Sequence, residues 1–170
     1  MRWQRHTLPV EVRVVPLAAG EKALAGCVAE SGAVVVGTRD AFYVSSGDGL
    51  VRIPWEQVEK ADWDNDKGQL SVVEVGTWGA ARPVHELTLA EPGRLLELVR
   101  ERVTASVVLQ RHVPIRGRRG VKVIARRAPG GNRALTWVYE FDEGVDPDDP
   151  EVRRLADLGL AKALEETGLR

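Results

Sequence analysis

The chain has 170 residues, of which 44% are hydrophobic and 29% are charged. This composition is typical of a folded protein with one ordinary domain, or with two small ones that share a core, and it excludes a disordered chain. The formal net charge of −1 gives no overall attraction to nucleic acid or to an anionic membrane.

The cysteine content and the N-terminal residues indicate the cellular compartment of the protein. A single cysteine, Cys27, cannot form an internal disulfide, and the first residues lack the apolar core of a signal peptide. No run approaches the roughly 18 apolar residues that a membrane span requires. We therefore expect a cytoplasmic protein without a transmembrane segment.

Residues 9–90 contain short β-prone runs that are separated by turn signals, at intervals of about ten residues. Many short strands with tight connections predict an antiparallel sandwich or barrel. The runs are VEVRVV (10–15), KALAGCVAE (22–30), SGAVVVGT (31–38), AFYVSS (41–46), LVRIPW (50–55), VEKADWD (58–64), QLSVVEVG (69–76) and PVHELTLA (83–90).

One connection between these runs has the acid spacing of a calcium loop, with Asp62, Asp64 and Asp66 at alternate positions. An EF-hand loop counted from Asp62 requires Gly at its sixth position and Glu at its twelfth, where this chain has Lys67 and Val73. The sequence NDKG has the residues of a tight hairpin turn instead. We therefore predict a turn between two strands and no metal site.

The segment EPGRLLELVRERVTASVVL (91–109) has the periodicity of an amphipathic helix. Pro92 suits the first helical turn. The apolar stripe consists of Leu95, Leu96, Val99, Val103 and Val107. The C-terminal end of this helix is open, because SVVLQRHVPI could equally be extended.

This order of strands followed by a capping helix, together with three stretches of sequence, resembles the pleckstrin-homology-like (PH-like) fold, especially its GRAM and bacterial PH branches. The stretches are GEKALA (20–25), VVVGTRDAFYV (34–44) and IPWEQVEKADW (53–63). The similarity covers about residues 9–107, and the layout also resembles that of uncharacterised actinobacterial proteins. The resemblance implies a binding or scaffolding role and no catalytic residue.

Residues 110–170 extend beyond that fold. GVKVIARRA (120–128) and NRALTWVYEFDEG (132–144) flank Pro129-Gly130-Gly131 and predict a hairpin, with RHVPIRG as a candidate third strand. On the second strand of the hairpin, alternate residues form an apolar face that must be covered: Leu135, Trp137, Tyr139 and Phe141.

The predicted cover of that face is a final helix. Asp148 and Asp149 before Pro150 are a helix-start signal. Apolar residues follow at helical spacing: Val152, Leu155, Ala156, Gly159, Leu160, Ala163 and Leu164. The expected fold class is therefore α+β with mainly antiparallel β structure: a PH-like sandwich or barrel over 9–109, capped by an amphipathic helix, and a ββα extension over 110–170 packed on it.

The charge distribution is uneven. Residues 102–139 hold 9 Lys+Arg and no acids, whereas residues 140–170 hold 4 Lys+Arg and 10 Asp+Glu. The basic segment 111–127 contains the candidate polyanion-binding residues Arg111, Arg116, Arg118, Arg119, Lys122, Arg126 and Arg127. Clustered arginines can bind phosphates of nucleic acid, nucleotides or lipid headgroups.

The alternative interpretation of the basic segment is internal neutralisation by the acidic segment 140–151, or plain solvation. Residues 102–136 contain no Phe, Trp or Tyr, which disfavours single-stranded nucleic acid as a ligand. Phosphate binding predicts salt-sensitive affinity that is lost when Arg118, Arg119, Arg126 and Arg127 become Ala.

Other candidate site residues are few. Trp78, flanked by Gly76 and Gly79, is a candidate partner contact, with packing over a sheet end as the alternative. No histidine has a second ligand at metal spacing, and no nucleophile, P-loop or dinucleotide motif occurs. The sequence predicts no catalytic residue, no metal and no cofactor.

The expected function is therefore a non-enzymatic interaction or scaffold module, with a protein partner or self-association. Polyanion binding through the basic segment, to nucleic acid or to an anionic headgroup, is the alternative. An enzyme without a visible motif would instead show a concave pocket with convergent polar groups and shifted titrations.

Overall fold

The computed structural model describes residues 7–76, 81–129 and 134–168. The fold is α+β, and the described strands form three antiparallel sheets, none of which closes on itself. The elements are α1 (Val10–Arg13), β1 (Ala25–Val28), β2 (Val34–Gly37), β3 (Ala41–Ser46), β4 (Gly49–Pro54), the 3-10 turn η1 (Trp55–Gln57), β5 (Val58–Asp64), β6 (Gln69–Glu74), β7 (Val84–Thr88), α2 (Leu95–Ser106), β8 (Val107–Arg116), β9 (Arg119–Arg127), β10 (Leu135–Phe141) and α3 (Pro150–Thr167).

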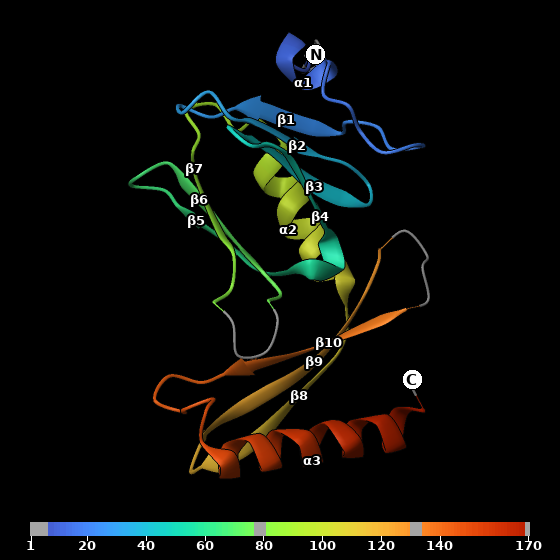
Figure 1. The fold of residues 1–170 in the computed structure, drawn as a ribbon, viewed down its shortest axis with the longest axis vertical. Helices are drawn as coiled ribbons and strands as arrows, with labels where there is room; N and C mark the ends of the chain where they lie inside the picture. Colours follow the sequence, from blue (N-terminus) through green and yellow to red (C-terminus); the bar gives the residue numbers. More distant parts are fainter. Residues whose placement is uncertain (1–6, 77–80, 130–133, 169–170) are drawn as a thin grey trace, which may run out of the picture.

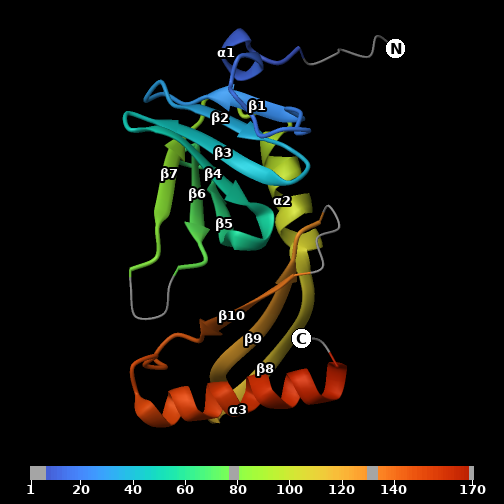
Figure 2. The same ribbon diagram turned by 45° about the vertical axis from the view of Figure 1, so that its right-hand side comes forward.

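Two sheets and α2 form an N-terminal body. Strands β1 to β4 make sheet A and strands β5 to β7 make sheet B, each in chain order, with α2 packed beside both (Figures 1 and 2). The two sheets meet where the Glu30 N–H donates to the Thr88 carbonyl at 2.9 Å. Seven of the eight predicted β-prone runs are therefore strands, in the expected order.

The hairpin turn at NDKG is also confirmed. Asp64 on β5 is paired with Gln69 on β6. The Asp64 carboxylate accepts hydrogen bonds from the backbone N–H groups of Asp66 and Lys67, at 3.0 and 3.1 Å. Gly68 closes the turn with φ = 59°, a left-handed conformation that glycine adopts without steric cost.

The main core lies between sheet A, sheet B and α2. The T-shaped pair Phe42 and Trp55, with ring centroids 6.0 Å apart, is fully buried in it. The Trp55 indole N–H donates to the Thr38 carbonyl at 3.0 Å, so the polar group of this buried side chain has a hydrogen-bond partner. A second, smaller cluster on the other face of sheet A contains Val12, Val36, Ala41 and Tyr43.

The prediction of a strand at 10–15 is wrong, because the chain forms the short helix α1 there. The valines of this segment therefore do not alternate between the two faces of a sheet. Val12 is buried against the outer face of sheet A, where Gly26 leaves room for it, while Val10 and Val14 are exposed. Pro9 and Pro16 enclose this segment and, without N–H groups, disfavour a paired strand.

Helix α2 ends earlier than the apolar stripe suggested, and β8 begins at the next residue. Val107 therefore belongs to β8, which resolves the open C-terminal end of the helix in favour of an extended SVVLQRHVPI segment. Leu95 and Val99 are buried as expected, and Leu98 is buried as well. The chain passes from the N-terminal body into the C-terminal part without a linker (Figure 2).

The C-terminal part is a three-stranded antiparallel sheet, sheet C, in the order β10-β9-β8. The predicted hairpin, the third strand and the final helix are all present. Asp149 is the N-cap of α3 and its side chain accepts a hydrogen bond from the Glu151 N–H at 2.9 Å. In Figure 1, α3 crosses the face of sheet C that points away from the N-terminal body.

Helix α3 covers sheet C unevenly, since it packs mainly on β8 and β9. Gly159 allows α3 to lie close to β8, because a Cβ atom at this position would lie 2.5 Å from a methyl group of Val113. The aromatic face of β10 is therefore only partly covered by α3. Its three aromatic residues remain half-buried at the edge of the sheet.

Candidate functional site

The aromatic face of β10, which α3 covers only in part, forms one wall of a pocket of about 710 Å³, which we call the β10 pocket. The aromatic residues of this wall are Trp137, Tyr139 and Phe141, at alternate positions of one strand. Pairing with β9 places them on the same face as Val121, Val123 and Ala125. The Tyr139 and Phe141 rings are edge-to-face, with centroids 6.3 Å apart.

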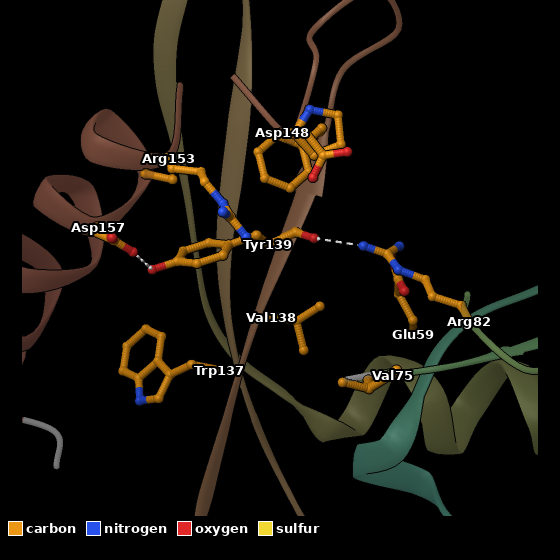
Figure 3. A pocket seen from close by; sticks show the side chains of 13 residues that line it. Glu59, Val75, Arg82, Trp137, Val138, Tyr139, Asp148, Arg153 and Asp157 are labelled. Atoms are coloured by element: carbon orange, nitrogen blue, oxygen red, sulfur yellow. Dashed lines mark hydrogen bonds and ion pairs between the residues drawn. The ribbon is translucent and has the colours of Figure 1, made fainter. Parts of the chain in front are cut away.

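The pocket continues around the edge strand β10 to the N-terminal body. In Figure 3 the Trp137 and Tyr139 side chains point toward α3, whereas Val138 points to the other side of the strand, toward Val75. Glu59 on β5, Val75 after β6 and Arg82 before β7 line the pocket. The Arg82 guanidinium donates to a carboxylate oxygen of Glu59 and, at 3.3 Å, to the Tyr139 carbonyl. One arginine therefore connects sheet B to the edge strand of sheet C.

Glu59 is the most unusual group in the pocket, because its side chain is only 6% exposed. The β5–β6 register shifts between Val58 and Lys60, so that Val58 and Glu59 are both buried. Burial raises the pKa of Glu59, and the nearby Glu140 raises it further, against the lowering effect of Arg82 and Arg126. Its second carboxylate oxygen, Oε2, has no hydrogen-bond partner in the described part of the chain.

The wall that the aromatic side chains face is the N-terminal part of α3 and the loop before it. Pro147, Asp148, Arg153, Ala156 and Asp157 line the pocket from this side. The Tyr139 hydroxyl donates to the Asp157 carboxylate at 3.0 Å (Figure 3). Burial, and then this bond to Asp157, raise the pKa of Tyr139, so the phenol stays neutral near pH 7.

The structure separates the seven predicted polyanion-binding residues into two groups. Four of them interact with other groups of the described chain. Arg111 pairs with Glu166 of α3, Arg116 lies 3.5 Å from Asp149, and Lys122 lies 3.2 Å from Glu140. Arg126 is only 4% exposed and its guanidinium points into the protein.

The other three cations lie at the two ends of β9. Arg118 and Arg119 are at the β8–β9 turn, and Arg127 is the last residue of β9. The acidic segment 140–151 thus supplies two of the partners that internal neutralisation predicts, and α3 supplies a third. The structure does not bring the seven cations together on one accessible surface.

This arrangement changes the test of polyanion binding. Arg126 has to stay in place because its loss would disturb the fold, so the appropriate variant replaces Arg118, Arg119 and Arg127 with Ala. We expect the parent and this variant to bind duplex DNA, RNA and anionic vesicles equally weakly at physiological salt, since few free cations remain to release counterions. Fluorescence anisotropy and vesicle sedimentation at two salt concentrations measure this. Tight binding of the parent that the variant loses would support a polyanion site.

The remaining predicted residues give no second site. Trp78 lies outside the described residues. His85 and His112 each face one carboxylate, Glu74 at 3.4 Å and Asp142 at 2.9 Å. The described residues contain no group of three or more potential metal ligands. Cys27 is buried in the core, where burial raises the pKa of its thiol to about 11.

Sequence reasoning missed Glu59, Arg82 and Asp157 as site residues. Strand alternation places Glu59 opposite the core, and only the register shift turns it inward. The one available signal was the run of three aromatic residues on β10, which was identified as a face to be covered. How much of this aromatic face α3 covers depends on where Gly159 of α3 packs on Val113 of β8.

Comparison of the chain with models of protein families, with curated proteins and with solved structures finds no match. No helix among the described residues is long and apolar enough to cross a membrane. The function is therefore inferred from the geometry of the molecule.

Proposed function

We propose that the protein is a non-enzymatic, PH-like interaction module of the GRAM or bacterial PH type. The arrangement of the N-terminal body supports this proposal, with four antiparallel strands, three further antiparallel strands and then a helix packed beside both sheets. The two sheets meet at the Glu30–Thr88 hydrogen bond, and among the described residues neither sheet closes on itself.

The observation that carries an interaction role is the β10 pocket. It combines three half-buried aromatic side chains with both signs of charge, and it lies where the N-terminal body meets sheet C (Figure 3). Aromatic residues in a concave, partly desolvated surface are typical of binding hot spots. We infer that a protein partner, or a second copy of this chain, inserts a side chain there.

The chemistry of the lining disfavours catalysis. A pocket with shifted titrations is also what an enzyme would show, and Glu59 is a lining carboxyl with a raised pKa. However, the described lining residues include no Ser, Thr, Cys, His or Lys. Glu59 is paired with a guanidinium, and the raised pKa of Tyr139 opposes formation of a phenolate nucleophile.

The proposal is tested by filling the pocket. Val75→Trp places a large ring in it, whereas Val84→Trp adds the same ring at a 53% exposed position on β7, outside the β10 pocket. A photocrosslinking residue in place of Asp148, an exposed residue of the pocket lining, should give a defined protein adduct or a dimer of the chain in cells that express it. Sedimentation velocity of purified protein measures self-association.

We expect Val75→Trp to abolish the adduct or the dimer, and Val84→Trp to leave it unchanged. A monomer at all concentrations, with no adduct from position 148, would contradict the proposal. Equal binding by the two variants would contradict the location of the site.

A further inference from the structure

Strand β7 is the outer strand of sheet B, and hydrogen bonds at its two ends define how it pairs with β6 (Figure 2). The Leu89 N–H donates to the Gly68 carbonyl at 2.8 Å, and the Glu74 N–H donates to the Pro83 carbonyl at 2.9 Å. The hydrogen-bonding side alternates along an antiparallel strand. The odd-numbered residues of β7 therefore bond to β6.

The even-numbered residues of β7 direct their backbone groups to the free edge of the sheet. The Thr88 carbonyl shows this direction, because it accepts a hydrogen bond from the Glu30 N–H of sheet A at 2.9 Å. Val84 and Glu86 have no such backbone partner among the described residues. The edge therefore offers two N–H groups and two carbonyl groups for pairing.

Other edge strands of the protein have features that hinder such pairing. Strand β8 has register shifts near both ends and contains Pro114. Strand β10 is held at the Tyr139 carbonyl by Arg82, and β5 has a register shift and packs on α2. Bulges, prolines and covering elements are the usual protection of a sheet edge. Strand β7 pairs with β6 in one continuous register, contains no proline and leaves Val84 53% exposed.

A groove of about 580 Å³ lies beside this edge, and we call it the β7 groove. Its other side is formed by the β1–β2 turn and the end of β3. The lining combines the core residues Val44 and Leu87 with the hydroxyl groups of Ser31, Ser45 and Ser46. Alternate side chains of an extended segment beside β7 would face this groove.

The charge around the groove favours a basic ligand. Glu86 lines the groove, and its described lining contains no lysine or arginine. The exposed residues Glu30 and Asp48 adjoin lining residues in the chain. A second copy of this chain, paired through β7, would bring two Glu86 side chains to one face of the joined sheet, where like charges repel. A basic segment of a partner protein would meet complementary charge.

We propose that the free edge of β7 binds an extended, basic segment of a partner protein as a further antiparallel strand of sheet B. The main chain of the segment pairs with the N–H and carbonyl groups of Val84 and Glu86. A lysine or arginine lies opposite Glu86, and an apolar residue two positions later lies opposite Val84. The residue between them points to the side of His85 and Leu87, toward the β7 groove. This inference goes beyond the proposed function, because the surface is separate from the β10 pocket.

The test uses the complete chain and peptide probes of defined charge. The first probe is Ac-Thr-Lys-Thr-Val-Thr-amide, in which the lysine and the valine have the required spacing. NMR titration follows its binding, with the backbone amides of Val84 and Glu86 as reporters. A matched probe carries N-methyl groups on the lysine and valine nitrogens and so lacks the two donors for β7. A third probe has glutamate in place of lysine.

Four variants make the test specific. Val84→Pro removes one N–H from the free edge, where a proline does not interrupt the pairing with β6. Val84→Trp is its matched control, because it keeps this N–H and an aromatic residue pairs well with valine across strands. Glu86→Lys reverses the charge at the edge, and Glu97→Lys reverses that of a 74% exposed side chain on α2. Thermal unfolding checks that all four stay folded.

We expect the lysine probe to shift both reporter amides in a saturable way. The N-methylated probe should bind at least about tenfold more weakly, and Val84→Pro, followed at Glu86, should weaken binding about fivefold. The glutamate probe should bind the parent about fivefold more weakly than the lysine probe, and Glu86→Lys should reverse this preference. Val84→Trp and Glu97→Lys should bind like the parent.

Three results would contradict parts of this proposal. No shift of the reporter amides, or equal binding of the N-methylated probe, would overturn the strand pairing. Equal binding of the lysine and glutamate probes would overturn the basic partner. Reporter amides that shift with protein concentration, without any probe, would overturn the partner protein in favour of a second copy of the chain.

Probe binding and crosslinking from position 148 are independent results. If the probe binds β7 but no adduct or dimer forms, the β10 interaction is refuted and the β7 edge stands. If the adduct or dimer forms but no probe binds, the β10 interaction stands and the β7 edge is refuted.

Discussion

Replacing Arg126 with Ala should lower the free energy of unfolding by about 3–5 kcal/mol, the range for removal of one member of a buried charged network. Arg126 is 4% exposed and lies on the face of sheet C that meets the N-terminal body. Its guanidinium donates to the Glu59 carbonyl at 2.8 Å, to the Ser106 hydroxyl at 2.9 Å and to the Val103 carbonyl at 3.4 Å. One side chain therefore connects β9 to β5 and to the end of α2.

The loss has two physical causes. The Glu59 carbonyl and the Ser106 hydroxyl would be left without this donor in a buried region. The negative charge of Glu59 would also lose a stabilising cation, since Arg126 lowers the pKa of Glu59. Burial lowers the pKa of Arg126 itself, while Glu59 and then Glu140 raise it, so the charges support each other.

Urea unfolding, followed by tryptophan fluorescence, measures this effect. Arg127→Ala is the matched control, because Arg127 is the next residue on β9 and its side chain is partly exposed. We expect the control to change stability by less than about 1 kcal/mol. A similar small change for Arg126→Ala would show that the buried guanidinium does not hold the two parts together.

Glu21→Gln should lower stability at neutral pH by about 2–3 kcal/mol, because it removes a buried, charge-assisted network. The Glu21 side chain is only 4% exposed, on the outer face of sheet A. It accepts hydrogen bonds from Thr38 at 2.9 Å, from the Tyr43 hydroxyl, and from two nitrogens of Arg52 at 3.1 Å each. Arg52 is 38% exposed, and solvent screening at this residue keeps the expected effect below that of Arg126.

The same network predicts a pH dependence. Burial raises the pKa of Glu21, but the hydrogen bonds from Arg52, Tyr43 and Thr38 outweigh it and leave the pKa below the ordinary value of 4.5. A carboxyl with a lowered pKa in the folded state stabilises the protein above the pKa of the unfolded chain. This stabilisation is lost as the pH falls through the pKa of the folded state.

The stability difference between the parent and Glu21→Gln should therefore be largest at neutral pH and should shrink as the pH falls below 4.5. Urea unfolding at a series of pH values measures it, with the exposed Glu11 on α1 replaced by Gln as the control. A difference that stays constant across this range would refute the ionised network.

The elements of this protein could be predicted from local patterns, because a strand or helix depends mainly on nearby residues. The alternation in β5 and β10, the NDKG turn and the Asp149-Pro150 start of α3 are all signals within a few positions. The one wrongly predicted element is α1, whose short valine pattern fits the periodicity of a helix as well as that of a strand. Its conformation depends on Gly26, which lets Val12 pack on sheet A.

The composition and order of the chain by themselves determined the α+β class, the strand sequence, the hairpins and the opposite charges of the basic and acidic segments. Only the tertiary structure decided which of those charges are accessible and where a pocket forms. Arg126 is a surface cation by its sequence context and a buried connector in the fold. The β10 pocket joins Glu59 and Arg82 to Tyr139 and Asp157, residues far apart in the chain. Such contacts depend on how α3 and sheet B pack on sheet C, and no local pattern specifies that packing.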